Sequence, residues 1–249
     1  AVARSIHPEG DVHTPYGATE SLPIASITAS EVLGETAARS AQGRGTCVGS
    51  RFSGIRWKVI KIDDGQIADV SQVVELPRGE IGELMVQGDV VTSEYVTRTA
   101  ANALHKVRDG NSFWHRMGDV GYLDERDRFW FCGRKAHRVE RVQSVMFTIP
   151  CEAILNQHSK VYRSALVGIG ERGHQSPVMV VETWPEHRPQ TPKDEQQLMA
   201  ELWDLAKSSP LTESVHDILL HPSLPVDIRH NAKIFREKLA VWAEETLGE

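Results

Sequence analysis

Residues 14–20 (TPYGATE) bring an aromatic ring, a glycine, a hydroxyl and a carboxylate together within one short segment. Glycine allows the backbone to approach a ligand closely, because it carries no Cβ. A loop built from Tyr16, Gly17, Thr19 and Glu20 can therefore pack a purine base and contact a phosphate group. The same residues also suit a plain turn before a helix, and this segment alone does not decide between the two.

Residues 117–124 (MGDVGYLD) place Asp119 directly after Gly118, where we expect one strand of a β-hairpin to end. A carboxylate has enough lone pairs to accept hydrogen bonds from both hydroxyls of a ribose. An aspartate in an exposed turn is the alternative. Gly133 and Arg134 follow at a short distance, and a run of this kind favours a nucleotide site over a plain turn.

Residues 225–236 (PVDIRHNAKIFR) combine a proline, a polar turn and Lys233, which we expect to open an amphipathic helix. Phe235 and Leu239 begin the apolar stripe of that helix, and Arg236 is expected to face water. A lysine at the helix start can swing a cation into a cleft. A merely solvated lysine is disfavoured there, because a cation opposes the helix dipole at the N-terminal end.

The composition is that of an ordinary globular protein. The chain has 249 residues, 40% of them hydrophobic, which is enough for one large domain or two small ones. A net charge of -6 without blocks of like charge argues against nucleic-acid binding and against a polybasic membrane anchor. No apolar run is long enough to span a membrane, and the first residues lack a signal-peptide pattern, so we expect a cytoplasmic protein. Three cysteines without CxxC spacing fit a reducing compartment.

The first half of the chain has the pattern of an antiparallel sheet. Alternating apolar residues broken by turn formers predict strands and hairpins over residues 55–62, 80–91 and 113–132. A short helix is expected over 99–107. Residues 31–54 are rich in Ser, Thr, Ala and Gly, and we expect them to form a surface loop.

After Gly133 the pattern changes to alternating helices and strands. The sequence predicts a helix from Pro150 to about residue 158, and a second helix through residue 207 with Thr191 as N-cap and Pro192 in the first turn. Expected strands are 164–169, 178–183 and 217–221. We therefore place a domain boundary at Gly133, which gives domains of 1–133 and 134–249, within the usual range of domain sizes.

A glycine motif at residues 168–173 (GIGERG) matches the GxGxxG pattern but lacks its context. A nucleotide-binding version must open a helix, whose N-terminal amide groups hold the phosphates. Here residues 174–177 lead into another strand, so we expect a hairpin loop.

Taken together and in this order, the three segments resemble the signature motifs of adenylate-forming enzymes, the superfamily of acyl-CoA synthetases, firefly luciferase and peptide-synthetase adenylation domains. The resemblance covers essentially the whole chain. It implies an α/β and α+β architecture: the rear part of a large N-terminal domain with a small barrel-like sheet, followed by a compact α+β lid domain that moves. The phosphate loop and most of the acyl pocket of these enzymes would then precede Ala1, in about 300 further residues, given the size of a two-domain enzyme.

The resemblance also implies a role for each motif residue, with ATP as substrate and Mg²⁺ as cofactor. Tyr16 and Gly17 would lie against adenine, Thr19 would contact the α-phosphate, Glu20 would hold magnesium, Asp119 would bind the ribose, Arg134 would bridge ribose and phosphate at the hinge, and Lys233 would stabilise the transition state of adenylation. Two positions depart from the family pattern. Ala136 stands where an aspartate or lysine is usual at the hinge, and Ala232 replaces the glycine before the lysine.

Within the superfamily, residues 129–139 (FWFCGRKAHRV) and 147–152 (FTIPCE) resemble olefin β-lactone synthetases. This implies ATP-dependent activation of a long-chain 2-alkyl-3-hydroxy fatty acid, ring closure by its own hydroxyl, and other enzymes of olefin biosynthesis as possible partners. Residues 143–147 contain no glycine, whereas CoA-using members normally carry one in this segment to leave room for the pantetheine arm. A long-chain acyl-CoA ligase is the alternative, other adenylate-forming activities remain open, and a non-catalytic nucleotide-binding or docking fragment is a further alternative.

Overall fold

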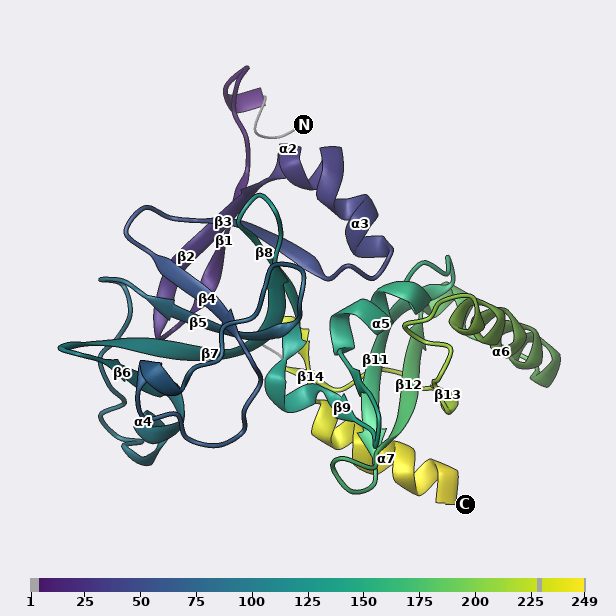
Figure 1. Cartoon of the computed structure of the whole chain (residues 1–249). Helices are drawn as coiled ribbons and strands as arrows, with labels where there is room; N and C mark the ends of the chain where they lie inside the picture. The colour runs from purple at the N-terminus through teal and green to yellow at the C-terminus, as the bar shows by residue number, and fades with distance from the viewer. Residues whose placement is uncertain (1–4, 228–229, 249) are drawn as a thin grey trace. The chain divides into compact units, whose positions relative to one another are not determined.

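The computed structural model of the chain (Figure 1) describes residues 5–227 and 230–248, with the side chains of residues 230–232 left out of the description. The chain forms two compact units. The first unit contains Ala1–Ser40 and Gly45–Ala136, and the second contains Ala41–Arg44 and His137–Glu249. Among the described residues, no helix is both long enough and apolar enough to cross a membrane.

The first unit is built on an eight-stranded antiparallel sheet, as the hairpin patterns predict. The strand order is β1-β2-β3-β8-β7-β5-β4, with β6 paired to β7. The strands are β1 (His13–Ala18), β2 (Ser21–Thr28), β3 (Thr46–Arg51), β4 (Arg56–Ile60), β5 (Gly82–Gln87), β6 (Lys106–Asp109), β7 (Ser112–Leu123) and β8 (Arg128–Arg134).

Both faces of this sheet are covered by apolar side chains. Strand β5 is buried along its whole length, and its residues alternate between two core clusters. Leu84 packs with Trp57 and Phe129 in one cluster, whereas Met85 packs with Trp114 in the other. Successive side chains of a strand point to opposite faces, so a strand buried on both faces joins the two clusters.

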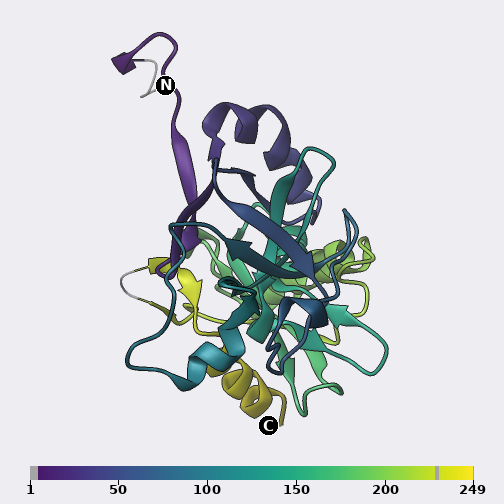
Figure 2. The same cartoon turned by 60° about the vertical axis from the view of Figure 1, so that its left-hand side comes forward.

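The prediction that residues 31–54 form a surface loop is wrong. It contains a helical stretch made of α2 (Ala29–Glu31), the π-helical turn η1 (Val32–Thr36) and α3 (Ala37–Ala41), and then strand β3. Thr28 starts this stretch with a capping box, in which its Oγ1 accepts the Glu31 N–H at 3.1 Å. Figure 2 shows the stretch beside the sheet. The Glu35 carboxylate pairs with Arg128 of β8 at 3.0 Å.

Three further short helices lie in the first unit or at the point of the chain where it ends. The 3₁₀-helix η2 covers Val70–Gln72, and α4 covers Ala100–His105, as predicted for this region. The 3₁₀-helix η3 (Lys135–His137) spans the point where the two units divide. The Lys135 ammonium donates to Glu83 Oε2 at 3.1 Å, and this buried carboxylate also binds Arg116 at 2.6 Å. The chain is therefore fastened to the first unit through Lys135.

The second unit is a three-layer α+β structure. Its central sheet has the order β11-β12-β13, with β12 antiparallel to β11 and parallel to β13. Two short hairpins, β9–β10 and β14–β15, stand outside this sheet. The elements are β9 (Val139–Glu140), β10 (Val145–Met146), α5 (Thr148–Leu155), β11 (Val161–Ile169), β12 (Ser176–Thr183), η4 (Pro185–His187), α6 (Pro192–Lys207), β13 (Asp217–Leu220), β14 (Val226–Asp227), β15 (His230–Ile234) and α7 (Arg236–Gly248).

Alternation along β11 explains the layers of the second unit. Leu166 belongs to the cluster that α5 and α6 cover, whereas Ala165 belongs to the cluster that α7 covers through Leu239. Helix α6 begins as predicted: Thr191 is the N-cap, and its Oγ1 accepts the Asp194 N–H at 3.2 Å. The glycine motif at 168–173 lies in the β11–β12 hairpin, which confirms that it opens no helix.

Candidate functional site

The motif residues 16–20 lie at the tip of the β1–β2 hairpin. Ala18 pairs with Ser21, so Thr19 and Glu20 form the two-residue turn between the strands. The register shifts at Gly17, where a Cβ would stand 2.3 Å from the Ser21 carbonyl oxygen. Only glycine fits this close approach without a backbone shift. The predicted loop is therefore a tight hairpin whose first strand carries Tyr16.

Tyr16, Asp119 and Arg134 meet in one cluster. The Tyr16 hydroxyl donates to Asp119 Oδ2, and Arg134 Nη1 donates to Asp119 Oδ1 at 2.6 Å and to the Met117 carbonyl at 3.1 Å. Asp119 and Arg134 are register partners on β7 and β8. The Tyr16 ring also packs against Phe129 of β8, with ring centroids 5.9 Å apart.

The contact between Tyr16 and Asp119 requires the sheet to curl. Strands β1 and β7 are four strand spacings apart in the sheet order, which is about 19 Å in a flat sheet. The Tyr16 hydroxyl reaches Asp119 nevertheless. The sheet is therefore strongly curved in the barrel-like manner expected from the sequence, and this curvature assembles the cluster.

Asp119 lies within β7 and not at the end of a strand, so this part of the prediction is wrong. Strand β7 continues to Leu123, and the turn comes only after it. Gly118 has a φ of +67°, a conformation that glycine adopts readily and other residues rarely do. The local break in the extended backbone falls immediately before Asp119.

Burial controls the charge of this cluster. Asp119 is 5% exposed, and burial raises the pKa of its carboxyl, although Arg134 and the Tyr16 hydroxyl act in the opposite direction. Burial and the neighbouring Asp119 raise the pKa of Tyr16 well above its usual value. The Tyr16 hydroxyl therefore stays protonated and acts as the hydrogen-bond donor to Asp119. Among the residues that the structure describes, each oxygen of Asp119 has one donor, and it retains capacity to accept another hydrogen bond.

Glu20 and Thr19 stand apart from this cluster. Thr19 is exposed in the turn, and Glu20 is half-buried. Glu20 Oε1 accepts a hydrogen bond from the Tyr95 hydroxyl at 2.8 Å. Burial of Glu20 opposes ionisation, but the Tyr95 hydrogen bond and nearby cationic side chains hold its pKa below the usual value. The charged carboxylate suits Mg²⁺, which binds hard oxygen ligands and commonly uses one or two carboxylates together with substrate phosphates.

Lys233 does not open a helix, and this prediction is wrong. Lys233 lies in strand β15, which pairs with β14, and helix α7 begins only at Arg236. Ile234 is 9% exposed and packs into the core of the second unit, whereas Lys233 is exposed. Neighbouring residues of a strand point to opposite sides. Burial of Ile234 therefore directs Lys233 toward solvent, and the dipole argument does not apply to it.

A buried ion pair forms at the start of α7, directly after the strand that carries Lys233. Arg236 Nη2 lies 2.6 Å from Glu152 Oε1, and the two side chains are 11% and 7% exposed. Glu152 Oε1 also accepts the Leu166 N–H at 2.9 Å. Burial raises the pKa of Glu152, and the charge of Arg236 opposes this shift. The expectation that Arg236 faces water is wrong: it joins α7 to α5 and β11.

Sequence reasoning missed two further residues near the motif, Tyr95 and Asn102. Asn102 on α4 accepts the Tyr95 N–H at 2.7 Å and donates to the Tyr95 carbonyl at 3.2 Å. No local pattern marks either residue, because Tyr95 is 75 positions from Glu20 in the sequence. Lys233 belongs to the second unit, whereas the other predicted site residues belong to the first.

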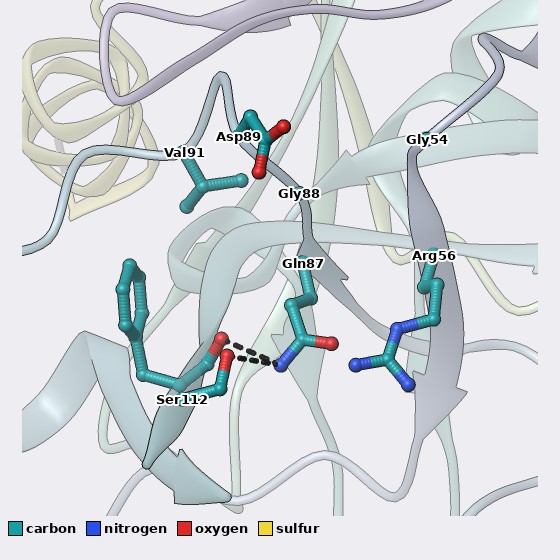
Figure 3. A pocket seen from close by; sticks show the side chains of 8 residues that line it. Gly54, Arg56, Gln87, Gly88, Asp89, Val91 and Ser112 are labelled. Atoms are coloured by element: carbon teal, nitrogen blue, oxygen red, sulfur yellow. Dashed lines mark hydrogen bonds between the residues drawn. The ribbon is translucent and has the colours of Figure 1, made fainter.

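A separate pocket of about 410 Å³ lies on the first unit (Figure 3). Gln87 Nε2 donates to Ser112 Oγ at 2.9 Å and to the Phe113 carbonyl at 3.0 Å. Gln87 Oε1 is buried and has no hydrogen-bond partner among the described residues. None of the predicted site residues lines this pocket. Its lining residues are Gly54, Arg56, Gln87, Gly88, Asp89, Val91, Ser112 and Phe113.

The fold matches solved structures of adenylate-forming enzymes. An amide bond synthetase from Marinactinospora thermotolerans superimposes with a TM-score of 0.68 at 23% identity, covering 97% of this chain and 44% of that chain. O-succinylbenzoate coenzyme A synthetase from Bacillus subtilis, solved in complex with ATP and a magnesium ion, gives 0.68 at 21% identity over 92% of this chain and 41% of that chain. No protein-family model matches the chain.

Sequence comparison gives closer relatives. The olefin β-lactone synthetase of Stenotrophomonas maltophilia is 44% identical over 253 aligned residues, covering 99% of this chain and 45% of the relative. That of Xanthomonas campestris is 44% identical over 237 residues, covering 93% and 42%. The chain is similar in sequence and in fold to adenylate-forming enzymes, as its motifs predict. Among these enzymes, the chain is similar to olefin β-lactone synthetases and spans less than half the length of the two relatives.

Proposed function

We propose that this chain is the nucleotide-binding rear part and the C-terminal lid, residues 134–249, of an enzyme that converts a long-chain 2-alkyl-3-hydroxy fatty acid into a β-lactone with ATP. The observation that carries this proposal is the 44% identity to two olefin β-lactone synthetases over nearly the whole chain. The cluster of Tyr16, Asp119 and Arg134 supports it, because it offers an aromatic face, ribose acceptors and a cation within one small site.

In this proposal the first unit binds the nucleotide. The Tyr16 ring contacts adenine, with Gly17 keeping the backbone close to it, and Asp119 accepts the ribose hydroxyls through the remaining lone pairs of its oxygens. Arg134 is 50% exposed, so its guanidinium can turn from Asp119 toward a phosphate. Thr19, exposed at the hairpin tip, donates to the α-phosphate.

The first chemical step forms an acyl-adenylate. A carboxylate oxygen of the fatty acid attacks the α-phosphorus, and the bond to the bridging oxygen of pyrophosphate breaks. Negative charge grows on the phosphorus oxygens in the transition state. Lys233, exposed on a hairpin with a rigid base, supplies a cation for these oxygens. Glu20 holds Mg²⁺, which neutralises phosphate charge when it is bound.

The second step closes the lactone ring. The 3-hydroxyl oxygen of the substrate attacks the acyl carbon, the bond between that carbon and the AMP oxygen breaks, and the hydroxyl proton is released. The nucleophile belongs to the same molecule, so it is present at a high effective concentration and needs no channel of its own. Residues 143–147 contain no glycine to widen a channel for a pantetheine arm.

An acyl-CoA ligase is the second candidate. A crotonobetaine/carnitine–CoA ligase of Escherichia coli is 34% identical to the chain, but only over 97 residues, or 38% of the chain. The longer match to β-lactone synthetases favours ring closure over thioester formation. A fragment that binds nucleotide without turnover is the third candidate, since the chain covers 45% of the length of the Stenotrophomonas maltophilia relative.

The test is a product assay with the full-length protein, a 2-alkyl-3-hydroxy fatty acid and Mg·ATP, with and without CoA. The expected products are AMP, pyrophosphate and β-lactone at a rate that CoA does not change. A thioester formed only with CoA would replace the lactone proposal with the ligase. The same assay with the 249-residue chain alone tests the third candidate, because nucleotide binding without AMP release would support the non-catalytic fragment.

A further inference from the structure

The segment between β5 and α4 is exposed over residues 92–99 except at Tyr95, which is half-buried. The Tyr95 side chain turns toward the protein, whereas the other side chains of this segment face water. The Tyr95 hydroxyl donates a hydrogen bond to Glu20 Oε1 at 2.8 Å. We propose that Tyr95 is a positioning residue, which orients the Glu20 carboxylate so that Oε2 becomes the magnesium ligand.

The same segment holds the backbone of Glu20 as well as its side chain. The Thr92 N–H donates to the Glu20 carbonyl at 2.8 Å, and Val91 bridges to Ser21 beside it. A carboxylate at the tip of a two-residue turn would otherwise rotate freely about its side-chain bonds. Two hydrogen bonds from one segment, one to the carbonyl and one to the carboxylate, remove this freedom.

Tyr95 is in turn fixed in place by its neighbours. The Asn102 side chain binds both the N–H and the carbonyl of Tyr95, at 2.7 and 3.2 Å. His105 packs edge-on against the Tyr95 ring with centroids 5.9 Å apart, and Lys106 Nζ lies 5.7 Å from the centroid of the same ring. Asn102 of α4 therefore fixes Tyr95, and Tyr95 fixes the Glu20 carboxylate. The position of the proposed ligand oxygen thus depends on the folded structure around α4.

This arrangement matches the general behaviour of metal ligands. Groups that hydrogen-bond to a ligating carboxylate fix its orientation, and their loss typically lowers metal affinity about 10- to 100-fold. The inference rests on the proposed role of Glu20 as the magnesium ligand. It adds that this role depends on a hydroxyl 75 positions away in the sequence.

The test is a binding measurement that does not depend on turnover. The dissociation constant of α,β-methylene-ATP for the full-length protein is measured by calorimetry with excess Mg²⁺ and again with excess EDTA. The dissociation constant with EDTA divided by the dissociation constant with Mg²⁺ gives the factor by which the metal strengthens binding. Tyr95→Phe should lower this ratio about 10- to 100-fold and leave the EDTA value unchanged. Asn102→Ala should change the ratio in the same direction, and Glu20→Gln should abolish the metal's contribution.

Two control variants separate positioning from a general effect. Asp119→Ala should weaken binding equally with and without metal, so its ratio should match the wild type. Tyr162→Phe removes a hydroxyl from a 43% exposed ring that packs on Trp184 in the second unit, and it should change neither constant.

Three outcomes would overturn the inference. If Tyr95→Phe keeps the wild-type ratio while Glu20→Gln loses it, Tyr95 does not position the ligand and the proposed function stands. If Tyr95→Phe weakens binding equally with metal and with EDTA, its role is structural. If Glu20→Gln also keeps the wild-type ratio, Glu20 is not a magnesium ligand, and that part of the proposed function fails as well.

Discussion

Replacement of Asp119 by alanine tests the nucleotide site at its most buried group. Asp119→Ala removes the acceptor proposed for the ribose hydroxyls. Hydrogen bonds to charged groups contribute about 1.5–3 kcal/mol, so the dissociation constant of ATP should rise about 10- to 150-fold. Calorimetric titration of the full-length protein with ATP measures this change. An unchanged constant would refute the ribose assignment.

The same substitution should also cost stability, by an amount that depends on pH. Without Asp119 the partly buried Tyr16 hydroxyl lacks an acceptor, at about 1–3 kcal/mol, whereas Arg134 is 50% exposed and regains water. Burial raises the pKa of Asp119 in the folded protein above its ordinary value of 3.8. Between pH 3.8 and this raised pKa, the native protein therefore binds more protons than the unfolded chain. Wild-type stability from this group therefore falls as pH rises above 3.8. The gap between wild type and Asp119→Ala should be widest at low pH and narrower at pH 7.

Asp124 provides a matched control in the turn that joins the same two strands, β7 and β8. It is 8% exposed and accepts hydrogen bonds from Arg128 and Trp130, both at 2.9 Å, but it has no place in the proposed site. Burial opposes its ionisation, yet these bonds hold its pKa below 3.8. Its stabilisation is therefore present above pH 3.8 and lost below. Asp124→Ala should destabilise the protein at pH 7 without changing ATP affinity. An equal loss of affinity in both variants would show that Asp119 acts only through folding.

Two further predictions concern the second unit. Lys233→Ala should reduce pyrophosphate exchange about 10²- to 10³-fold, the usual loss of one charge-stabilising donor, while the exposed control Lys193→Ala keeps the wild-type rate; normal exchange in Lys233→Ala would make it an ordinary surface lysine. Glu152→Gln leaves the charge of Arg236 without its buried partner and should lower the free energy of unfolding by about 3–5 kcal/mol in urea titration. Lys58→Ala, which breaks a more exposed pair, should cost under about 1 kcal/mol, and equal losses would contradict the distinction.

Local sequence signals predict the elements that depend on local interactions. Thr191 followed by Pro192 predicts the start of α6, because the cap needs only a hydroxyl, a proline and the next turn of the same helix. The turn at residues 124–127 predicts the β7–β8 hairpin for the same reason. The chemistry of Tyr16 and Asp119 is readable from their motifs, although the curvature that brings their side chains together is not.

The wrong predictions depend on contacts between distant residues. Gly49 suggests a loop, but it lies in β3, where a Cβ would stand 1.9 Å from the Ser26 carbonyl oxygen. The residues after Pro225 look like a helix start, but pairing of Val226 with Ile234 makes Lys233 part of a strand. Tyr95 carries no signal at all, because it lies in the segment between β5 and α4, whereas its partner Glu20 lies in the β1–β2 turn. A single sequence contains no direct record of such pairings.

Oxygen labelling of the fatty acid tests the central claim, which is activation of the carboxyl group followed by attack of the 3-hydroxyl. The full-length protein is incubated with Mg·ATP and a 2-alkyl-3-hydroxy acid carrying ¹⁸O in both carboxyl oxygens, and the products are analysed by mass spectrometry. The proposed steps predict one labelled oxygen in AMP and one in the β-lactone. Unlabelled AMP together with a doubly labelled lactone would show that ATP activates the hydroxyl instead, and would contradict the claim.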